Sequence, residues 1–183
     1  MPLALTGRNN EGVTTDEHDV AAHVRAVLSG LQTPWEIIPC DPALADTAEF
    51  CAHYGYAPED SANTIMVVAK VDPPRYAACV VLATTRLDVN RSVRTRFGVK
   101  KASFADAAVV AELTRMTLGG VTAIGLPAEV PLWVDAAVMA RARIVLGGGS
   151  RDGKVLCPPS LLLELPNVEV VEGLAGPVPP RVG

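Results

Sequence analysis

Two apolar, β-branched runs separated by a short proline turn constrain the fold of this chain more than any other feature. The runs are NTIMVVAKV at 63–71 and YAACVVLATT at 76–85, and the tetrapeptide DPPR joins them. Buried strands with so short a connection pair antiparallel as a hairpin. Although predicted helices alternate with the remaining strands, this antiparallel pair predicts an α+β fold: a single domain with a mixed β-sheet flanked by helices, not a doubly wound parallel sheet.

The other segments carry helix and strand signals in alternation. We expect a helix over 15–31 with Thr15 as N-cap, one that begins at Asp46 or Thr47 and ends at Gly55, and one over 103–116 with Ser103 as cap. WEIIPC at 35–40 predicts a strand. The segment 129–165 predicts a strand, a short helix, a strand, a glycine triplet, a strand and a helix begun by Pro158, and VEVVEGLA at 168–175 closes the domain. The domain then spans 15–175, with loose tails at 1–14 and 176–183.

Composition narrows the class of protein. The 183 residues are 49% hydrophobic, enough for one buried core, and only 4% aromatic, which disfavours the stacking platforms of many single-strand binders. The start lacks a secretory pattern and no apolar run is long enough to span a membrane, so we expect a cytoplasmic protein without a membrane partner. Four cysteines without a C-x-x-C pair predict buried free thiols.

One segment is strongly basic although the chain is acidic overall. Residues 86–101 hold six basic side chains against Asp88, a net +5, which leaves −9 for the rest of a chain whose formal charge is −4. Such a strip can dock one phosphate backbone, whereas general nucleic-acid binding, DNA included, is not expected. A solvated helix face is the equally open alternative. The basic strip consists of Arg86, Arg91, Arg94, Arg96, Lys100 and Lys101.

Two glycine-rich segments are the candidates for chemistry: LGGVTAIG at 118–125 and LGGGSRDGK at 146–154. Neither is a P-loop, because Lys154 enters a strand, and neither lies where a dinucleotide fingerprint requires. Glycine amides without a covering Cβ could hold a carbonyl or a developing oxyanion, although tight turns alone would also explain them. No G-x-S-x-G elbow and no His–carboxylate cluster occurs, so we predict no metal and no cofactor. A hydrolase of this kind would position a water and polarise a carbonyl.

With these segments in order, the chain resembles the YbaK family of aminoacyl-tRNA deacylases, which is related to the editing insertion of bacterial prolyl-tRNA synthetase. KKASFADAAVVAELTRMTLGGVTAIGLP at 100–127 resembles the family's glycine-loop run, and VLGGGSRDGKVLCPPSLLLEL at 145–165 resembles its second loop, written around S-G-x-x-R. The resemblance covers about 15–175. It implies a mixed, partly barrel-like sheet with flanking helices and hydrolysis of mischarged tRNA in trans. The glycine loop would bind the ester carbonyl, and the terminal ribose hydroxyl would help to activate water.

The carry-over of the family motif is incomplete. Asn63 stands where the family has a functional lysine; it can hydrogen-bond but brings no charge. Lys70 is an odd seven residues further on and so points to the opposite face. Gly147 replaces the serine of the second loop, and Ala123 replaces a proline. The resemblance implies catalytic roles for Asn63, Thr64, Gly119, Gly120, Val121 and Thr122, substrate binding by Gly147, Gly148, Gly149 and Ser150, and tRNA binding by the basic strip and Arg151.

Two functions therefore remain open. The first is a freestanding deacylase for a small amino acid such as Ala, Cys or Ser, whose partner is the aminoacyl-tRNA acceptor end; an aminoacyl-tRNA synthetase could be a further partner. The second is a non-catalytic module that binds an amino acid or an aminoacyl-adenosine, which the missing lysine favours.

Overall fold

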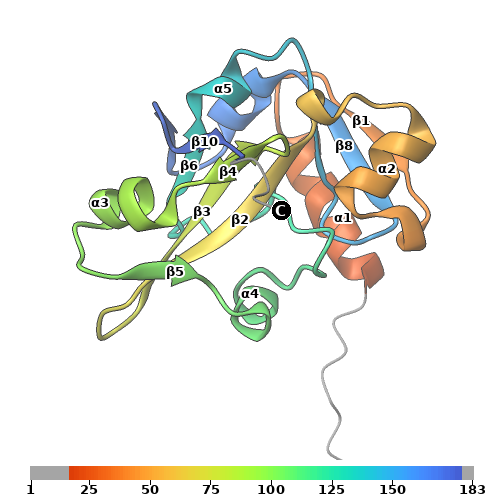
Figure 1. The fold of residues 1–183 in the computed structure, drawn as a ribbon. Helices are drawn as coiled ribbons and strands as arrows, with labels where there is room; N and C mark the ends of the chain where they lie inside the picture. Colours follow the sequence, from red (N-terminus) through yellow and green to blue (C-terminus); the bar gives the residue numbers. More distant parts are fainter. Residues whose placement is uncertain (1–16, 179–183) are drawn as a thin grey trace, which may run out of the picture.

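The computed structural model describes residues 17–178, so the predicted cap Thr15 and the predicted N-terminal tail lie outside the described residues. The main sheet is mixed, as predicted, and its strand order is β5-β2-β3-β6-β9 (Figure 1). Its strands are β2 (Ala62–Ala69), β3 (Arg75–Leu82), β5 (Ala102–Phe104), β6 (Leu132–Asp135) and β9 (Val168–Val171). The predicted hairpin is confirmed: β2 and β3 pair antiparallel, while β3–β6 and β6–β9 are parallel.

A second sheet continues from the start of β2. It has the order β1-β8-β7, and all its pairings are antiparallel. A bridge between Ser61 and Val145 connects the two sheets, but they do not close into a barrel. A separate ribbon of β4 and β10 includes Gly176 and Pro177, which we had placed in the C-terminal tail. These strands are β1 (Glu36–Pro39), β7 (Ile144–Gly147), β8 (Gly153–Cys157), β4 (Thr85–Leu87) and β10 (Ala175–Pro177).

The helices flank the sheets. α2 has Asp46 as N-cap and ends at Gly55, whose φ is 75°, as the sequence predicted. The predicted helix cap at Ser103 is wrong, because Ser103 pairs with Val68 in β5 and α4 begins only after Asp106. The predicted helix after Pro158 is a 3-10 helix. The helical elements are α1 (Glu17–Ser29), α2 (Thr47–Tyr54), α3 (Arg94–Phe97), α4 (Ala107–Thr114), α5 (Ala136–Met139), η1 (Pro42–Leu44), η2 (Pro58–Asp60), η3 (Val89–Val93) and η4 (Pro159–Glu164).

The hairpin is buried on both faces. Met66 and Val80 pack in the cluster that includes α1, whereas Val67 and Cys79 pack in the cluster that includes Trp133. All four cysteines are free and buried, as predicted, and burial raises the pKa of Cys79 to about 12. Within residues 17–178, no helix combines the length and apolar character needed to cross a bilayer.

Candidate active site

The two glycine loops contact each other backbone to backbone. Gly149 N donates to Gly120 O at 2.7 Å, and Thr117 N donates to Gly149 O at 3.1 Å. A Cβ on Gly120 would lie 2.3 Å from Ser150 O, and one on Gly147 would lie 2.4 Å from Val121 O. These separations are shorter than any van der Waals contact, so the loops can meet only where side chains are absent.

This contact leaves two amides of the first loop open. Gly120 N donates to Thr117 O at 2.8 Å, but in the described chain neither Gly119 N nor Val121 N donates to a backbone carbonyl. Each open amide belongs to a peptide group whose carbonyl is held: Leu118 O by the Arg151 guanidinium at 3.3 Å, and Gly120 O by Gly149 N. A bonded carbonyl polarises its peptide group and strengthens the N–H as a donor. The loop therefore carries two strengthened donors, Gly119 N and Val121 N, that have no backbone acceptor among the described residues.

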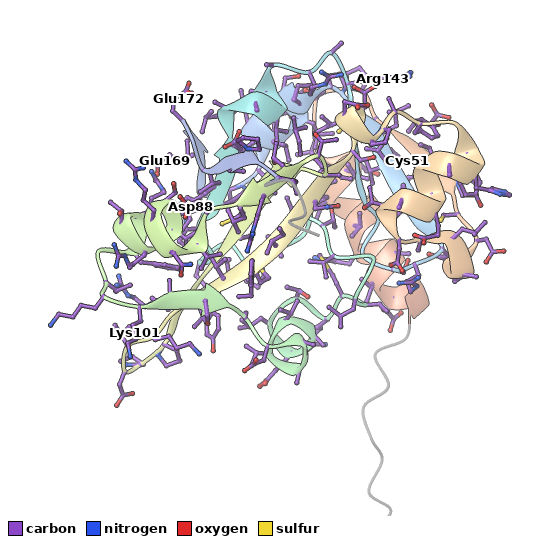
Figure 2. The ribbon with its side chains drawn as sticks, in the orientation of Figure 1. Cys51, Asp88, Lys101, Arg143, Glu169 and Glu172 are labelled. Carbon is purple, nitrogen blue, oxygen red and sulfur yellow. The ribbon has the colours of Figure 1, made fainter. Side chains whose placement is uncertain are left out.

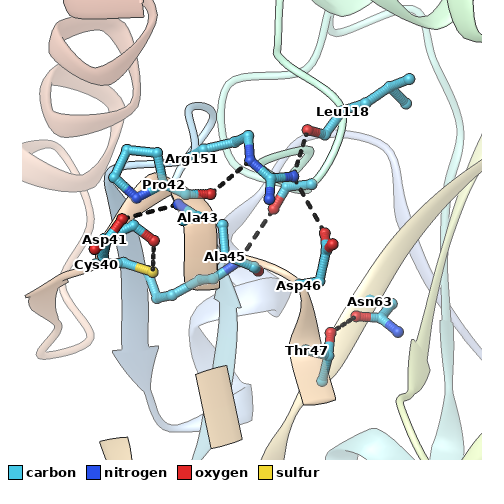
Figure 3. Close-up of polar contacts among 12 residues, drawn as sticks. Cys40, Asp41, Pro42, Ala43, Ala45, Asp46, Thr47, Asn63, Leu118 and Arg151 are labelled. Atoms are coloured by element: carbon cyan, nitrogen blue, oxygen red, sulfur yellow. Dashed lines mark hydrogen bonds and ion pairs between the residues drawn. The ribbon is translucent and has the colours of Figure 1, made fainter. Parts of the chain in front are cut away.

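Arg151 holds the first loop against the start of α2 (Figure 3). Its Nε donates to Pro42 O at 2.9 Å, and its Nη1 donates to Asp46 Oδ1 at 3.1 Å as well as to Leu118 O. A Cβ on Gly119 would lie 2.1 Å from Nη1, and the φ of Gly119 is 88°. Gly119 is thus required both by its backbone conformation and by the approach of the guanidinium. The side chain that we had assigned to tRNA is occupied by internal contacts.

Lys154 is the site residue that the sequence did not reveal as such. Its ammonium donates to Ala45 O at 2.6 Å and to Gly119 O at 3.1 Å, and it lies 5.7 Å from the centre of the Phe50 ring. The side chain is buried, and this burial lowers the pKa of Lys154. A lysine inside an apolar strand, GKVLC, was the available signal, because a buried ammonium requires partners.

Asn63 lies at the edge of the same cluster. Thr47, the first residue of α2, donates its hydroxyl to Asn63 Oδ1 at 3.1 Å (Figure 3). Asn63 is exposed, whereas its neighbour Thr64 points to the other sheet face, since successive strand residues alternate. The hydroxyl of Thr64 is buried and has no hydrogen-bond partner in the part of the chain that the structure describes. The structure therefore does not bring these two predicted site residues to one space.

The remaining predicted residues shape the loops. Thr122 is fully buried, and its hydroxyl accepts from Ile124 N at 3.4 Å. Ser150 is also buried and donates to Asp152. A Cβ on Gly148 would lie 2.6 Å from Gly153 O, so this glycine too is fixed by a backbone contact. Among residues 17–178, no group of three or more His, Cys, Asp or Glu side chains could hold a metal.

Comparison with known proteins identifies the architecture. The model of the aminoacyl-tRNA editing domain matches residues 41–165, a range that contains both glycine loops, Asn63 and Lys154. The chain belongs to the aminoacyl-tRNA editing domain family.

Two solved structures share this fold. A candidate trans-editing enzyme for prolyl tRNA synthetase is 20% identical with a TM-score of 0.71, and the match covers 84% of this chain and 95% of that one. The hypothetical protein APE2540 is 25% identical with a TM-score of 0.73, over 82% and 97% of the two chains. The predicted fold is therefore confirmed.

In this editing domain the basic strip lies away from the glycine loops, on β4, η3, α3 and the turn before β5. Lys101 and Cys51, which belongs to α2, lie on opposite sides of the molecule (Figure 2). Arg96 is the half-buried member: it pairs with Glu169 and lies 5.0 Å from the centre of the Trp133 ring. The exposed members are Arg86, Arg91, Arg94, Lys100 and Lys101.

Proposed function

We propose that this editing domain hydrolyses, in trans, the ester of tRNA mischarged with a small amino acid such as Ala, Cys or Ser. The observation that carries the proposal is the pair of open amides at Gly119 and Val121, in peptide groups whose carbonyls are held by Arg151 and Gly149. Family membership supplies the class of substrate.

The amides act on the ester carbonyl. As water attacks the carbonyl carbon, negative charge develops on the carbonyl oxygen, and donors that are already fixed stabilise it without reorganisation. The Lys154 ammonium, bound to Gly119 O, adds a positive charge directly behind the loop. The bond from the carbonyl carbon to the ribose oxygen then breaks. The ribose oxygen takes up the proton that the attacking water has lost, which leaves a free amino acid and uncharged tRNA. The terminal ribose hydroxyl of the tRNA helps to activate the water, as in the family that the chain resembles.

Asn63 favours a second candidate function. It stands where the family has a lysine, and its amide can orient an aminoacyl end but cannot supply charge. A domain with intact loops and no such charge could bind the aminoacyl-adenosine end of tRNA without cleaving it.

The test is deacylation of Ala-, Cys- and Ser-tRNA that carry the proline anticodon, with Asn63→Lys measured beside the wild type. We expect the wild type to hydrolyse at least one of the three above the uncatalysed rate. Hydrolysis by Asn63→Lys alone would instead establish the binding module. If neither protein hydrolyses any of them, the proposed reaction is wrong.

A further inference from the structure

A pocket of about 400 Å³ lies under the basic strip, away from the glycine loops. Four of the side chains that line it are cations, and no acid is among its described lining residues, which are Lys70, Asn90, Arg94, Lys100, Lys101 and Ala102. We propose that this pocket binds the phosphodiester backbone of the tRNA acceptor arm, several nucleotides from the ester. The inference rests on the proposed function for the identity of the nucleic acid, but its test does not require hydrolysis.

The fold brings these cations together from three segments. Lys70 N, after the end of β2, donates to Lys101 O at 3.0 Å, because β5 adds to the edge of β2. Val99 N donates to Arg94 O at 3.2 Å, which turns the chain from α3 back toward β5. All four cations are exposed, and none forms an ion pair with a described residue. Converging cations without an acid favour an anionic ligand.

The pocket continues into a larger hollow of about 620 Å³, and the two share Asn90 and Ala102. This hollow adds Arg86 and Phe104, which is 55% exposed, and one acid, Asp88, whose carboxylate accepts from Arg91 N. An aromatic face beside cations is the combination on which single-stranded nucleic acid stacks a base while its phosphates are neutralised. The shape and chemistry of the joined hollows thus fit a strand of nucleic acid better than a single small phosphate.

The position of the pocket sets which substrates can reach it. Asn63, Val67 and Ala69 share one face of β2 by alternation, and α3 packs on this face through Phe97. Asn63 lies near the start of β2 and Lys70 directly follows its end, so the two are seven residues apart, roughly 23 Å at about 3.3 Å per residue. An aminoacyl-adenosine ester bound at the glycine loops ends far short of the pocket, whereas the acceptor arm of tRNA extends into it.

The experiment compares Arg94→Gln with Arg91→Gln. Both are exposed arginines of the basic strip, but only Arg94 lines the pocket. Binding of fluorescein-labelled, unacylated tRNA is measured from 50 to 200 mM salt. We expect Arg94→Gln to weaken binding about tenfold and to reduce the slope of log K against log[salt] by about 1, with Arg91→Gln within twofold of the wild type. Equal losses of tRNA affinity in the two variants, or no tRNA binding by the wild type, would overturn the proposal that this pocket binds tRNA. Unchanged thermal unfolding verifies that both variants fold.

Two further arms identify the ligand and separate the two proposals. Inorganic phosphate at millimolar concentration should not displace tRNA; if it does so fully, the pocket is a site for small phosphates. Hydrolysis of an aminoacyl-adenosine ester should be equal in the wild type and Arg94→Gln, and a parallel loss there would contradict a remote pocket. Binding of tRNA that depends on Arg94, without hydrolysis of any ester, would leave the pocket in place and reject only the deacylase.

Discussion

Gly119 and Gly120 are adjacent and required for different reasons. Gly119 has a φ of 88°, in the left-handed region that favours glycine, whereas Gly120 is required because its Cα faces the backbone of Ser150. The two adjacent glycines thus meet two different requirements: the backbone conformation at Gly119 and the close backbone contact at Gly120. Only the conformational requirement can be suggested by the local sequence, because turn residues reveal it.

Gly120→Ala should therefore be costly although it adds only a methyl group. A backbone carbonyl 2.3 Å away cannot move aside as a flexible side chain would, so we expect a loss of about 1–3 kcal/mol in the free energy of unfolding. Gly30→Ala is the matched control, because its Cβ would meet nothing closer than 3.4 Å. Urea denaturation of both variants checks this. Equal stability of the two would show that the loops separate without cost.

The site could be predicted from the sequence only where its contacts are local. The glycine pair was recognised from its spacing, but the role of Lys154 depends on Ala45, 109 positions away. Arg151 was assigned to tRNA through the family resemblance, whereas its acceptors are the backbone carbonyls of Pro42 and Leu118, which no residue type reveals.

At the scale of elements, the Glu164 carboxylate connects the segment that follows α1 to η4. Glu164 accepts from Gln32 N at 2.6 Å and from Thr33 N at 2.8 Å, and these hydrogen bonds hold the pKa of Glu164 below its usual value. A carboxyl whose pKa is lowered by folding stabilises the protein above its unfolded pKa and loses that contribution as pH falls through the folded pKa.

Glu164→Gln should consequently destabilise the protein most above about pH 4.5, and the difference from wild type should shrink as the solution becomes more acidic. Unfolding by urea at a series of pH values measures it. Glu112→Gln, on the exposed face of α4, is the control and should change stability little at any pH. A difference for Glu164→Gln that is constant with pH would mean that its charge plays no part.

The long hairpin was predictable from the sequence, whereas the three-residue strands β4, β5 and β10 were not. The hairpin of β2 and β3 has eight residues in each strand, enough to show a pattern. β5 has only three residues. Its Ser103 resembles a helix cap in the sequence, because its pairing with the edge of β2 depends on residues far away along the chain. β4 and β10 were missed for the same reason, because their pairing joins segments at 85–87 and 175–177.

At the scale of the whole molecule, Arg151 connects two regions that are distant in sequence: residues 42–46, which include η1 and the N-cap of α2, and the first glycine loop. Its planar guanidinium reaches Pro42 O, Asp46 and Leu118 O at once. A lysine carries all its donors on one nitrogen and so lacks the separate Nε and Nη1 positions that this arginine uses.

Arg151→Lys should thus lower the free energy of unfolding by about 1–3 kcal/mol and slow deacylation, because Leu118 O loses its donor and the Gly119 amide its support. Arg143→Lys is the control: Arg143 is 58% exposed, and it lies 3.7 Å from Asp60 in its ion pair. Urea unfolding and single-turnover deacylation are the measurements. Full activity in Arg151→Lys would show that the charge suffices and that the forked geometry does not matter.

The burial of all four cysteines has a practical consequence for following this molecule at work. Because Cys40, Cys51, Cys79 and Cys157 are enclosed, and burial raises the pKa of Cys79 and Cys157 to about 12, the native surface presents no competing thiolate. A cysteine introduced at exposed Ala108, beside the hollow-lining β5, would then be the one position to which a maleimide dye couples. The domain can therefore be labelled at a single site. Energy transfer from this dye to a dye on tRNA would then report tRNA binding in real time.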